Sequence, residues 1–185
     1  STVAYKIVRY PDQVTLYKNL KETTFTDHLA PTELTKYWYV IIPMANGKQG
    51  EEALSNKVIM GPSYEMPYKE SFATQESFEK YTVEDGNKDG ITWDYNIYGH
   101  YVEYSGIKKG DDWLISPPVK LEKRGYYKLS FNVRCLSANV HQLSVFAGSL
   151  PDTESMRQQL VPTTEFKTDF MDKLIEQKFM VDNDG

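Results

Sequence analysis

The sequence contains a single cysteine and only three histidines among its 185 residues. One thiol can form neither an internal disulfide framework nor a cysteine-based zinc cage. The histidines show no His-Glu-x-x-His pair and no other metal-ligand spacing. Cys135 is predicted to lie in mid-strand on an apolar face, where a thiol is more often a buried apolar group than a nucleophile. Disulfide-stapled domains and cysteine-ligated zinc domains are therefore excluded.

Long apolar runs and clustered positive charge are also lacking. The most apolar stretches, such as residues 38–42, fall far short of the ~20 residues that span a bilayer, and the chain does not start with a signal-peptide pattern. Lysine and arginine total 21 against 26 acidic residues, a net charge of −5. Because nucleic acids and anionic membranes bind clustered basic residues, we expect neither as a partner. The chain is either cytosolic or a piece of a longer secreted protein.

No catalytic motif stands out. A Gly-x-Ser-x-Gly elbow is absent, and Gly86 and Gly90 lie among acidic residues that would repel phosphate. The 26 acidic residues always offer some carboxylate pair for glycoside hydrolysis, but nothing singles one out. We therefore expect a chain that is not an enzyme.

Aromatic residues are what the sequence has in abundance. Fourteen Tyr, eight Phe and three Trp are accompanied by frequent Val, Ile and Thr, and these residue types suit half-buried strands. Turn-forming residues interrupt the chain about every ten positions, which indicates an all-β class with antiparallel β-sandwiches. The predicted strands include residues 4–10, 14–20, 23–26, 36–42, 57–60, 126–136, 143–147 and 177–181. Of these, 143–147 is expected to pair with 126–136. One or two helical turns are expected within residues 152–159, after an N-cap at Asp152 or Thr153.

Four motifs in the first third of the chain carry a resemblance. They are Tyr5-Lys6-Ile7-Val8-Arg9, Thr24-Phe25-Thr26-Asp27, Tyr37-x-Tyr39-x-Ile41, and Asn46-Gly47 followed by Gly50. Residues 5–60 thereby resemble the second half of a fibronectin type III domain. The resemblance implies that Tyr37 is the tyrosine-corner residue, whose hydroxyl bonds back to upstream backbone; the alternative is an ordinary half-buried strand tyrosine. The family's first two strands have no counterpart, so we expect more sequence before residue 1.

A second set of motifs follows. It comprises Pro67-Tyr68-x-Glu70-x-Phe72, an acidic loop before Trp93, and Asp112-Trp113-Leu114-Ile115-Ser116-Pro117-Pro118. Residues 66–185 thereby resemble the cleaved-adhesin, or choice-of-anchor J, family. That family implies a jelly roll in secreted bacterial proteins, including the adhesin modules of gingipain proteases. We expect a fibronectin type III-like segment at 1–61, a linker at 62–66 and a jelly roll at 67–185. Because closing strands are absent, the chain is expected to be covalently part of a larger polypeptide.

Two places are candidate calcium sites. Asp85-x-Asn87-x-Asp89-Gly90 matches the first half of a calcium loop, with oxygen ligands at alternate positions and a glycine at the sharp turn. Position 12 of that loop is Asn96 rather than Glu, and no amphipathic helices flank it, so an EF-hand is excluded. The alternative is an Asx-rich turn between strands. The cleaved-adhesin resemblance implies Glu70 as the second candidate calcium ligand. The alternative is that Glu70 is a solvent-facing strand residue.

Two further features can contribute to binding. Asp111 and Asp112 could add metal ligands, although adjacent acids after two lysines are more often a solvated turn. The aromatics between residues 93 and 104 form the densest cluster in the chain, and exposed rings on a sandwich stack on sugars or bind proteins. Tyr98 and Tyr101 are the candidate ligand-binding residues; Trp93 and Tyr95 are expected to fill the core.

The sequence therefore predicts a non-enzymatic adhesion or ligand-binding module, secreted or at the bacterial cell surface. Its expected partner is a host protein or a glycan, with calcium as its possible cofactor. One alternative is an accessory region of a secreted protease or glycosidase whose catalytic domain lies elsewhere. The other is a spacer without a ligand, in which Tyr98 and Tyr101 would be buried.

Overall fold

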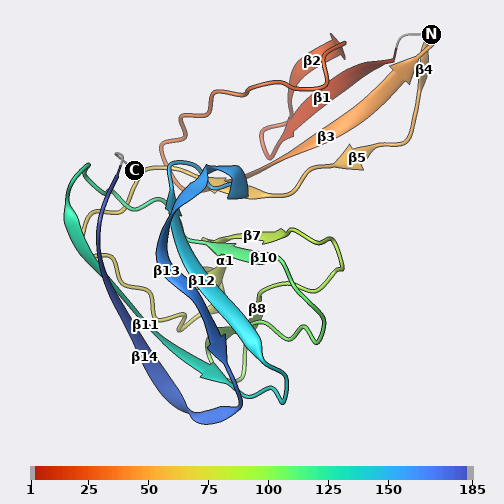
Figure 1. Cartoon of the computed structure of the whole chain (residues 1–185). Coiled ribbons are helices and arrows are strands. Elements are labelled where there is room, and N and C mark those ends of the chain that lie inside the picture. Colours follow the sequence, from red (N-terminus) through yellow and green to blue (C-terminus); the bar gives the residue numbers. More distant parts are fainter. Residues whose placement is uncertain (1–2, 183–185) are drawn as a thin grey trace.

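The structure is a computed structural model, and it describes residues 3–182. The outermost residues of the two predicted domains, 1–2 and 183–185, lie outside the described residues. Strands dominate the described chain, and the helical turns there are the five-residue α1 (Gln75–Glu79) and the 3₁₀ turn at Thr153–Ser155 (Figure 1). The all-β prediction is confirmed. No helix within residues 3–182 has the length and apolar character needed to cross a membrane.

The first part of the chain forms one antiparallel sheet around a long central strand. That strand, β3 (Thr35–Ala45), pairs with β1 (Ala4–Tyr10) on one side and with short strands on the other. Register places Ile7 opposite Ile41, and Ile7 is only 2% exposed. The strands are β1 (Ala4–Tyr10), β2 (Val14–Leu20), β3 (Thr35–Ala45), β4 (Lys48–Gln49), β5 (Ala53–Leu54) and β6 (Val58–Met60).

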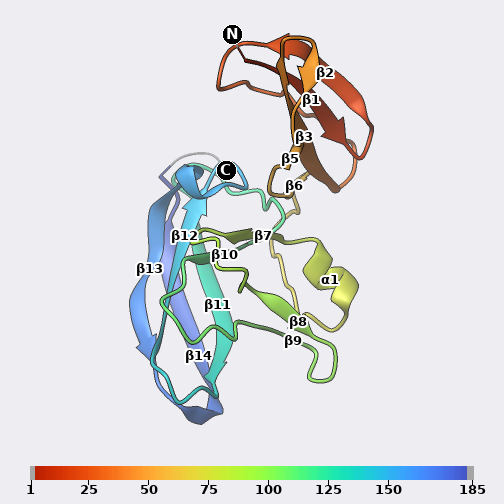
Figure 2. The same ribbon diagram turned by 90° about the vertical axis from the view of Figure 1, so that its right-hand side faces the viewer.

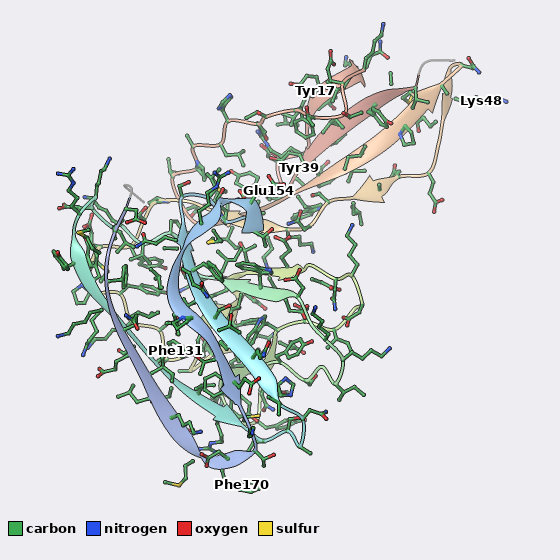
Figure 3. The ribbon with its side chains drawn as sticks, viewed as in Figure 1. Tyr17, Tyr39, Lys48, Phe131, Glu154 and Phe170 are labelled. Atoms are coloured by element: carbon green, nitrogen blue, oxygen red, sulfur yellow. The ribbon has the colours of Figure 1, made fainter. Side chains whose placement is uncertain are left out.

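The segment between β2 and β3 differs from the prediction. Residues 23–26 form no strand but cross the sheet as an irregular loop. The ring of Phe25 packs edge-on against Tyr17 (5.7 Å between centroids) and Tyr39 (5.6 Å); Tyr17 and Tyr39 are labelled in Figure 3. The hydroxyl that bonds back to this segment is that of Tyr39, which donates to Asp27 Oδ2 at 2.9 Å. Tyr37 is buried, with the Arg9 guanidinium 5.9 Å above its ring. Side chains, not a backbone ladder, hold this loop.

The second part consists of four two-stranded antiparallel ribbons. The two long ones, β11–β14 and β12–β13, lie against one another in both views (Figure 1, Figure 2), and Gln158 Nε2 on β13 donates to the carbonyl of Met180 on β14 at 2.6 Å. The predicted strand at 126–136 is confirmed as β11, on which half-buried Leu129, Phe131 and Val133 alternate with exposed residues. The ribbons are β7 (Thr82–Asp85) with β10 (Asp112–Ile115), β8 (Asp94–Asn96) with β9 (Tyr101–Glu103), β11 (Tyr126–Cys135) with β14 (Asp169–Met180), and β12 (His141–Gly148) with β13 (Met156–Phe166).

Two predictions about these ribbons are wrong. Strand β12 pairs with β13 rather than with β11, whose partner is β14. Only three residues of the expected helical stretch are helical: Asp152 Oδ1 accepts from Ser155 N at 2.8 Å as the predicted N-cap, and β13 begins at Met156. Loop length does not explain the pairing, because the connection between β11 and β12 (residues 136–140) is shorter than that between β12 and β13 (residues 149–155). The pairing was misassigned because β13, the true partner of β12, was not among the predicted strands.

The two parts are joined by specific hydrogen bonds across residues 61–63. The N–H of Ile59 on β6 donates to Thr82 Oγ1 on β7 at 2.8 Å, and Thr82 is 2% exposed. Farther on, Tyr64 N donates to Pro118 O at 2.8 Å, and Lys120 N donates to Tyr64 O at 2.9 Å. The Thr82 hydroxyl therefore satisfies a buried amide of the other sheet.

Replacing Thr82 by Val is expected to lower the free energy of unfolding by about 1–3 kcal/mol, because the Ile59 N–H loses its acceptor in a buried place. Thr82→Ser keeps the hydroxyl and is expected to cost less than about half of that. Urea unfolding of both variants measures the difference. A loss for Thr82→Ser without a loss for Thr82→Val, which keeps the methyl group, would mean that the methyl group, and not the hydrogen bond, stabilises this junction.

Candidate functional site

The acidic loop after β7 is folded by its own side chains. Asp85 Oδ2 accepts a hydrogen bond from Gly90 N at 2.8 Å, and its Oδ1 accepts from Asp89 N at 3.2 Å. Asp89 Oδ1 accepts from Ile91 N at 2.8 Å. The Asp89 contact is an Asx-turn, and the Asp85 contacts close the wider loop; in both, short polar side chains replace backbone acceptors. The loop's own backbone N–H groups therefore hold Asp85 and Asp89 close to one another.

A second loop, residues 104–111, lies against the first. Asn87 Nδ2 donates to Asp89 Oδ2 at 3.1 Å and to the carbonyl of Lys109 at 3.0 Å. Gly86 N donates to Asp111 O at 2.8 Å, and a Cβ at Gly86 would come within 2.5 Å of that oxygen. Only glycine permits this approach. The structure thus joins Asp85, Asn87 and Asp89 to the Asp111–Asp112 pair.

Asp112 is the electrostatically unusual residue of this cluster. Both of its carboxylate oxygens are buried and lack a hydrogen-bond partner among residues 3–182, and so does the hydroxyl of Tyr104. Burial is the main cause that raises the pKa of the Asp112 carboxyl, and the negative charges of Asp85 and Asp89 raise this pKa further. The nearby Tyr104 hydroxyl lowers it, although the two groups do not meet hydrogen-bond geometry. A buried carboxylate beside other carboxylates is costly unless a cation joins it.

The acidic cluster is not a preformed cage. Within the described chain, no three His, Cys, Asp or Glu side chains stand close enough to hold a metal ion between them. Calcium takes six to eight oxygen ligands and accepts backbone carbonyls, amide oxygens and waters beside carboxylates. The candidate ligands of this cluster are the carboxylates of Asp85, Asp89 and Asp112, with the Asn87 side chain and the Lys109 carbonyl.

Glu70, the other calcium candidate, has contacts of a different kind. Its Oε1 accepts from Phe72 N at 2.7 Å. Its charge acts on Tyr68 and Tyr81, whose hydroxyls share a hydrogen bond of 3.1 Å; burial is the main reason that the pKa of each phenol is raised. These contacts connect Glu70 to residues on both sides of α1 and not to the acidic loop.

The β8–β9 hairpin carries the exposed aromatic residues. Tyr98 is 91% exposed and Tyr101 is 42% exposed. Asn96 Oδ1 accepts from Tyr98 N at 3.1 Å and Gly99 N at 2.8 Å, while its Nδ2 donates to the Tyr101 hydroxyl at 3.2 Å. A Cβ at Gly99 would lie 2.0 Å from the Tyr101 ring. The turn is therefore fixed by Asn96, and both rings are held outward.

Neighbouring aromatics point inward, as expected for core residues. Tyr95 is 9% exposed, and its hydroxyl lies 3.1 Å from the carbonyl of Phe72 and 3.1 Å from His100 Nδ1. Trp93 is half-buried, and its indole N–H donates to the carbonyl of Asp112 at 3.1 Å. Trp93 therefore connects the exposed hairpin to the acidic cluster.

Sequence reasoning did not single out Asn96 or Tyr104. The Asn-x-x-Gly pattern at residues 96–99 is a turn signal that could have identified Asn96. Tyr104 has no such signal, because its importance depends on the burial of its hydroxyl next to Asp112.

Comparison with known proteins finds no relative for this chain. No protein-family model matches it, no curated protein matches it, and no solved structure matches its fold.

Proposed function

We propose that the chain is a non-enzymatic ligand-binding module of the adhesion type, belonging to a larger secreted or bacterial cell-surface protein, with a host protein or glycan as its ligand. The observation that supports it is the 91% exposure of Tyr98 on a turn fixed by Asn96. A large apolar ring held in water is a cost unless a partner covers it, and Tyr is enriched at binding surfaces.

Calcium has a supporting role in this proposal. A cation bound by Asp85, Asp89 and Asp112 would neutralise the buried Asp112 carboxylate. Because the Asp112 carbonyl accepts from the Trp93 indole two positions before Tyr95, the cation would also stiffen the base of the β8–β9 hairpin. Calcium would thus preorganise the tyrosines without touching the ligand.

The test is a binding screen of the full chain against a glycan panel and immobilised matrix proteins, with and without Tyr98→Ala. For any ligand that binds, Tyr98→Ala is expected to lower the affinity by about tenfold or more, as for an aromatic hot spot. Tyr126→Ala is the matched control, because Tyr126 is 81% exposed on β11, away from the hairpin. A ligand bound equally by the Tyr98 variant would move the site elsewhere, and no bound ligand would favour the spacer.

A further inference from the structure

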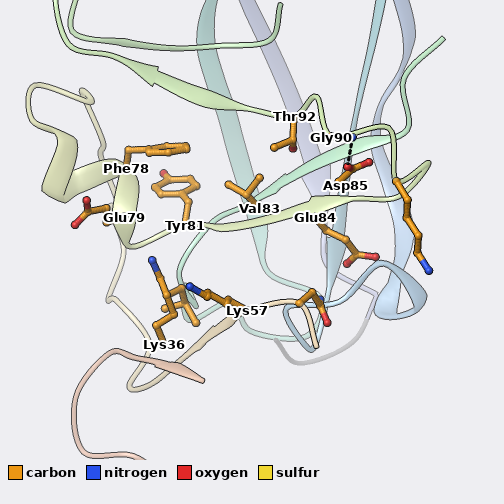
Figure 4. A pocket seen from close by; sticks show the side chains of 13 residues that line it. Lys36, Lys57, Phe78, Glu79, Tyr81, Val83, Glu84, Asp85, Gly90 and Thr92 are labelled. Carbon is orange, nitrogen blue, oxygen red and sulfur yellow. Dashed lines mark hydrogen bonds between the residues drawn. The ribbon is translucent and has the colours of Figure 1, made fainter. Parts of the chain in front are cut away.

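A second concave site lies between the two parts of the chain. It is an open pocket of about 580 Å³ that is bounded by the β3–β6 pair on one side and by α1 and β7 on the other (Figure 4). Small-ligand sites have volumes of about 300–1,000 Å³ and often lie between structural units. The exposed tyrosines of the β8–β9 hairpin are not among its lining residues. This pocket is therefore separate from the surface proposed above, and the inference does not rest on that proposal.

One wall of the pocket is apolar. Tyr81 and Val83 line it, together with Phe78 of α1, while Ile59 lines the opposite, β3–β6 side. The Tyr81 hydroxyl already pairs with Tyr68, so this residue offers mainly its ring to the pocket. Such a wall accommodates a flat or branched apolar group better than a polyhydroxylated one, which needs a hydrogen-bond partner for each buried hydroxyl.

Two ammonium groups stand opposite this wall. Lys36 lies across from Ile59 in the β3–β6 register, so Lys36 and Lys57 project from the same face of the pair. Figure 4 shows them side by side, facing Tyr81 and Val83. Lys57 Nζ lies 5.1 Å above the Trp38 ring, and neither lysine forms an ion pair with a carboxylate of residues 3–182. Adjacent like charges repel, and an anion between them would remove the repulsion.

The remaining polar groups limit what the anion can be. Glu84 lines the same pocket, and burial raises the pKa of its carboxyl. Asp85 and Glu79 also line the pocket, and so does a third lysine, Lys88. These acids repel a multiply charged group, which disfavours a phosphate and favours a single carboxylate held at the lysine end. The Thr92 hydroxyl, which also lines the pocket, is buried without a hydrogen-bond partner among the described residues, so a ligand or a water has a free hydrogen-bonding group there.

We propose that this pocket binds a monocarboxylate with an apolar body. The carboxylate lies between the ammonium groups of Lys36 and Lys57, and the body packs on Tyr81, Val83 and Ile59. Two sources have this chemistry: a free aryl or alkyl carboxylate, and the C-terminal residue of a peptide with an apolar side chain. In either case the ligand touches both parts of the chain and would restrain their relative motion.

Isothermal titration calorimetry on the full chain tests the proposal with four probes. Phenylacetate is expected to bind, and phenylacetamide, which has the same body without the charge, at least about tenfold more weakly. A short peptide ending in Leu-Phe with a free carboxylate, compared with its C-terminal amide, tests the peptide source in the same way. Tighter binding of the free peptide than of phenylacetate would identify a chain terminus as the ligand. Tighter binding of phenylacetate would identify a small carboxylate as the ligand. Either result supports the proposal that the pocket binds a carboxylate.

The variants locate the site. Lys36→Gln with Lys57→Gln is expected to lower carboxylate affinity about tenfold or more, and Lys128→Gln, an exposed lysine paired with Glu176 on the β11–β14 ribbon, is the matched control. Tyr98→Ala is expected to leave binding unchanged, which separates this site from the hairpin. Equal binding of carboxylate and amide, wild-type affinity in the double variant, or no binding of any probe at millimolar concentration would overturn the proposal.

Discussion

Millimolar calcium is expected to raise the melting temperature of this protein by roughly 5–10 °C above the value measured with chelator. A ligand at 100 times its Kd stabilises the folded state by ~2.7 kcal/mol, and a chain of this size gains ~2–4 °C for each kcal/mol. The physical reason is Asp112, whose two buried carboxylate oxygens have no hydrogen-bond partner in residues 3–182. Calcium would replace an uncompensated buried charge by a coordinated one.

Variants of the acidic cluster show where such a shift arises. Asp85→Asn combined with Asp89→Ala is expected to abolish it. Asp112→Asn is expected to be more stable than the wild type in chelator, by about 1 kcal/mol, because an amide carries no charge to bury, and to respond less to calcium. Asp172→Asn changes an exposed aspartate paired with Arg134 and should respond like the wild type. A shift that survives in the double variant and vanishes in Glu70→Gln would place the ion at Glu70; no shift at all would leave the loop as a turn.

The fold was predictable wherever burial alternates along a strand. On β11, residues 127, 129, 131 and 133 are half-buried and their neighbours exposed, and this period-two pattern is visible in the sequence. Strand β13 was missed because its pattern is weak: Val161 and Phe166 are buried, while the residues between are mostly polar and include Pro162. Strand β14 was predicted too short, because Phe170 and Leu174 near its start are exposed, at 77% and 61%, and so follow no burial pattern. The pairing of ribbons depends on contacts between distant segments, which local sequence does not specify.

The candidate site was predictable in part. The Asp-x-Asn-x-Asp-Gly pattern correctly indicated a loop held by its own oxygens. It could not show that the loop would close over residues 104–111, because that contact joins segments more than twenty residues apart. Ile97 alternates with Trp93 and Tyr95 in the sequence, yet it is 54% exposed, because β8 ends at Asn96 and the turn redirects the chain. That turn is also what exposes Tyr98.

Asp27→Asn is expected to destabilise the first sheet by about 2–3 kcal/mol. The Asp27 carboxylate accepts from Arg9 Nη1 at 3.0 Å through both oxygens and from the Tyr39 hydroxyl at 2.9 Å. Its side chain is only 11% exposed and that of Arg9 16%. Loss of the charge leaves a part-buried guanidinium and a phenol with a weaker shared acceptor, and each such deficit costs about 1–3 kcal/mol. The loop of residues 21–34, which has no ladder to hold it, should then detach from the sheet.

Asp12→Asn is the matched control, because Asp12 also binds Arg9, with Nη2 2.6 Å from its Oδ2, but its side chain is 41% exposed. The cost there is expected to be below about 1 kcal/mol, as for solvent-exposed ion pairs. Hydrogen bonding to Arg9 lowers the pKa of Asp12, so this small contribution is present above the unfolded pKa of about 3.9 and is lost as the pH falls through the lower folded value. Urea unfolding of Asp27→Asn and Asp12→Asn at neutral pH compares their losses in the free energy of unfolding.

Equal losses would show that charge alone, and not burial under the loop, determines the strength of this network. A larger loss for Asp27→Asn would show that an irregular segment is fixed to the sheet by one buried carboxylate.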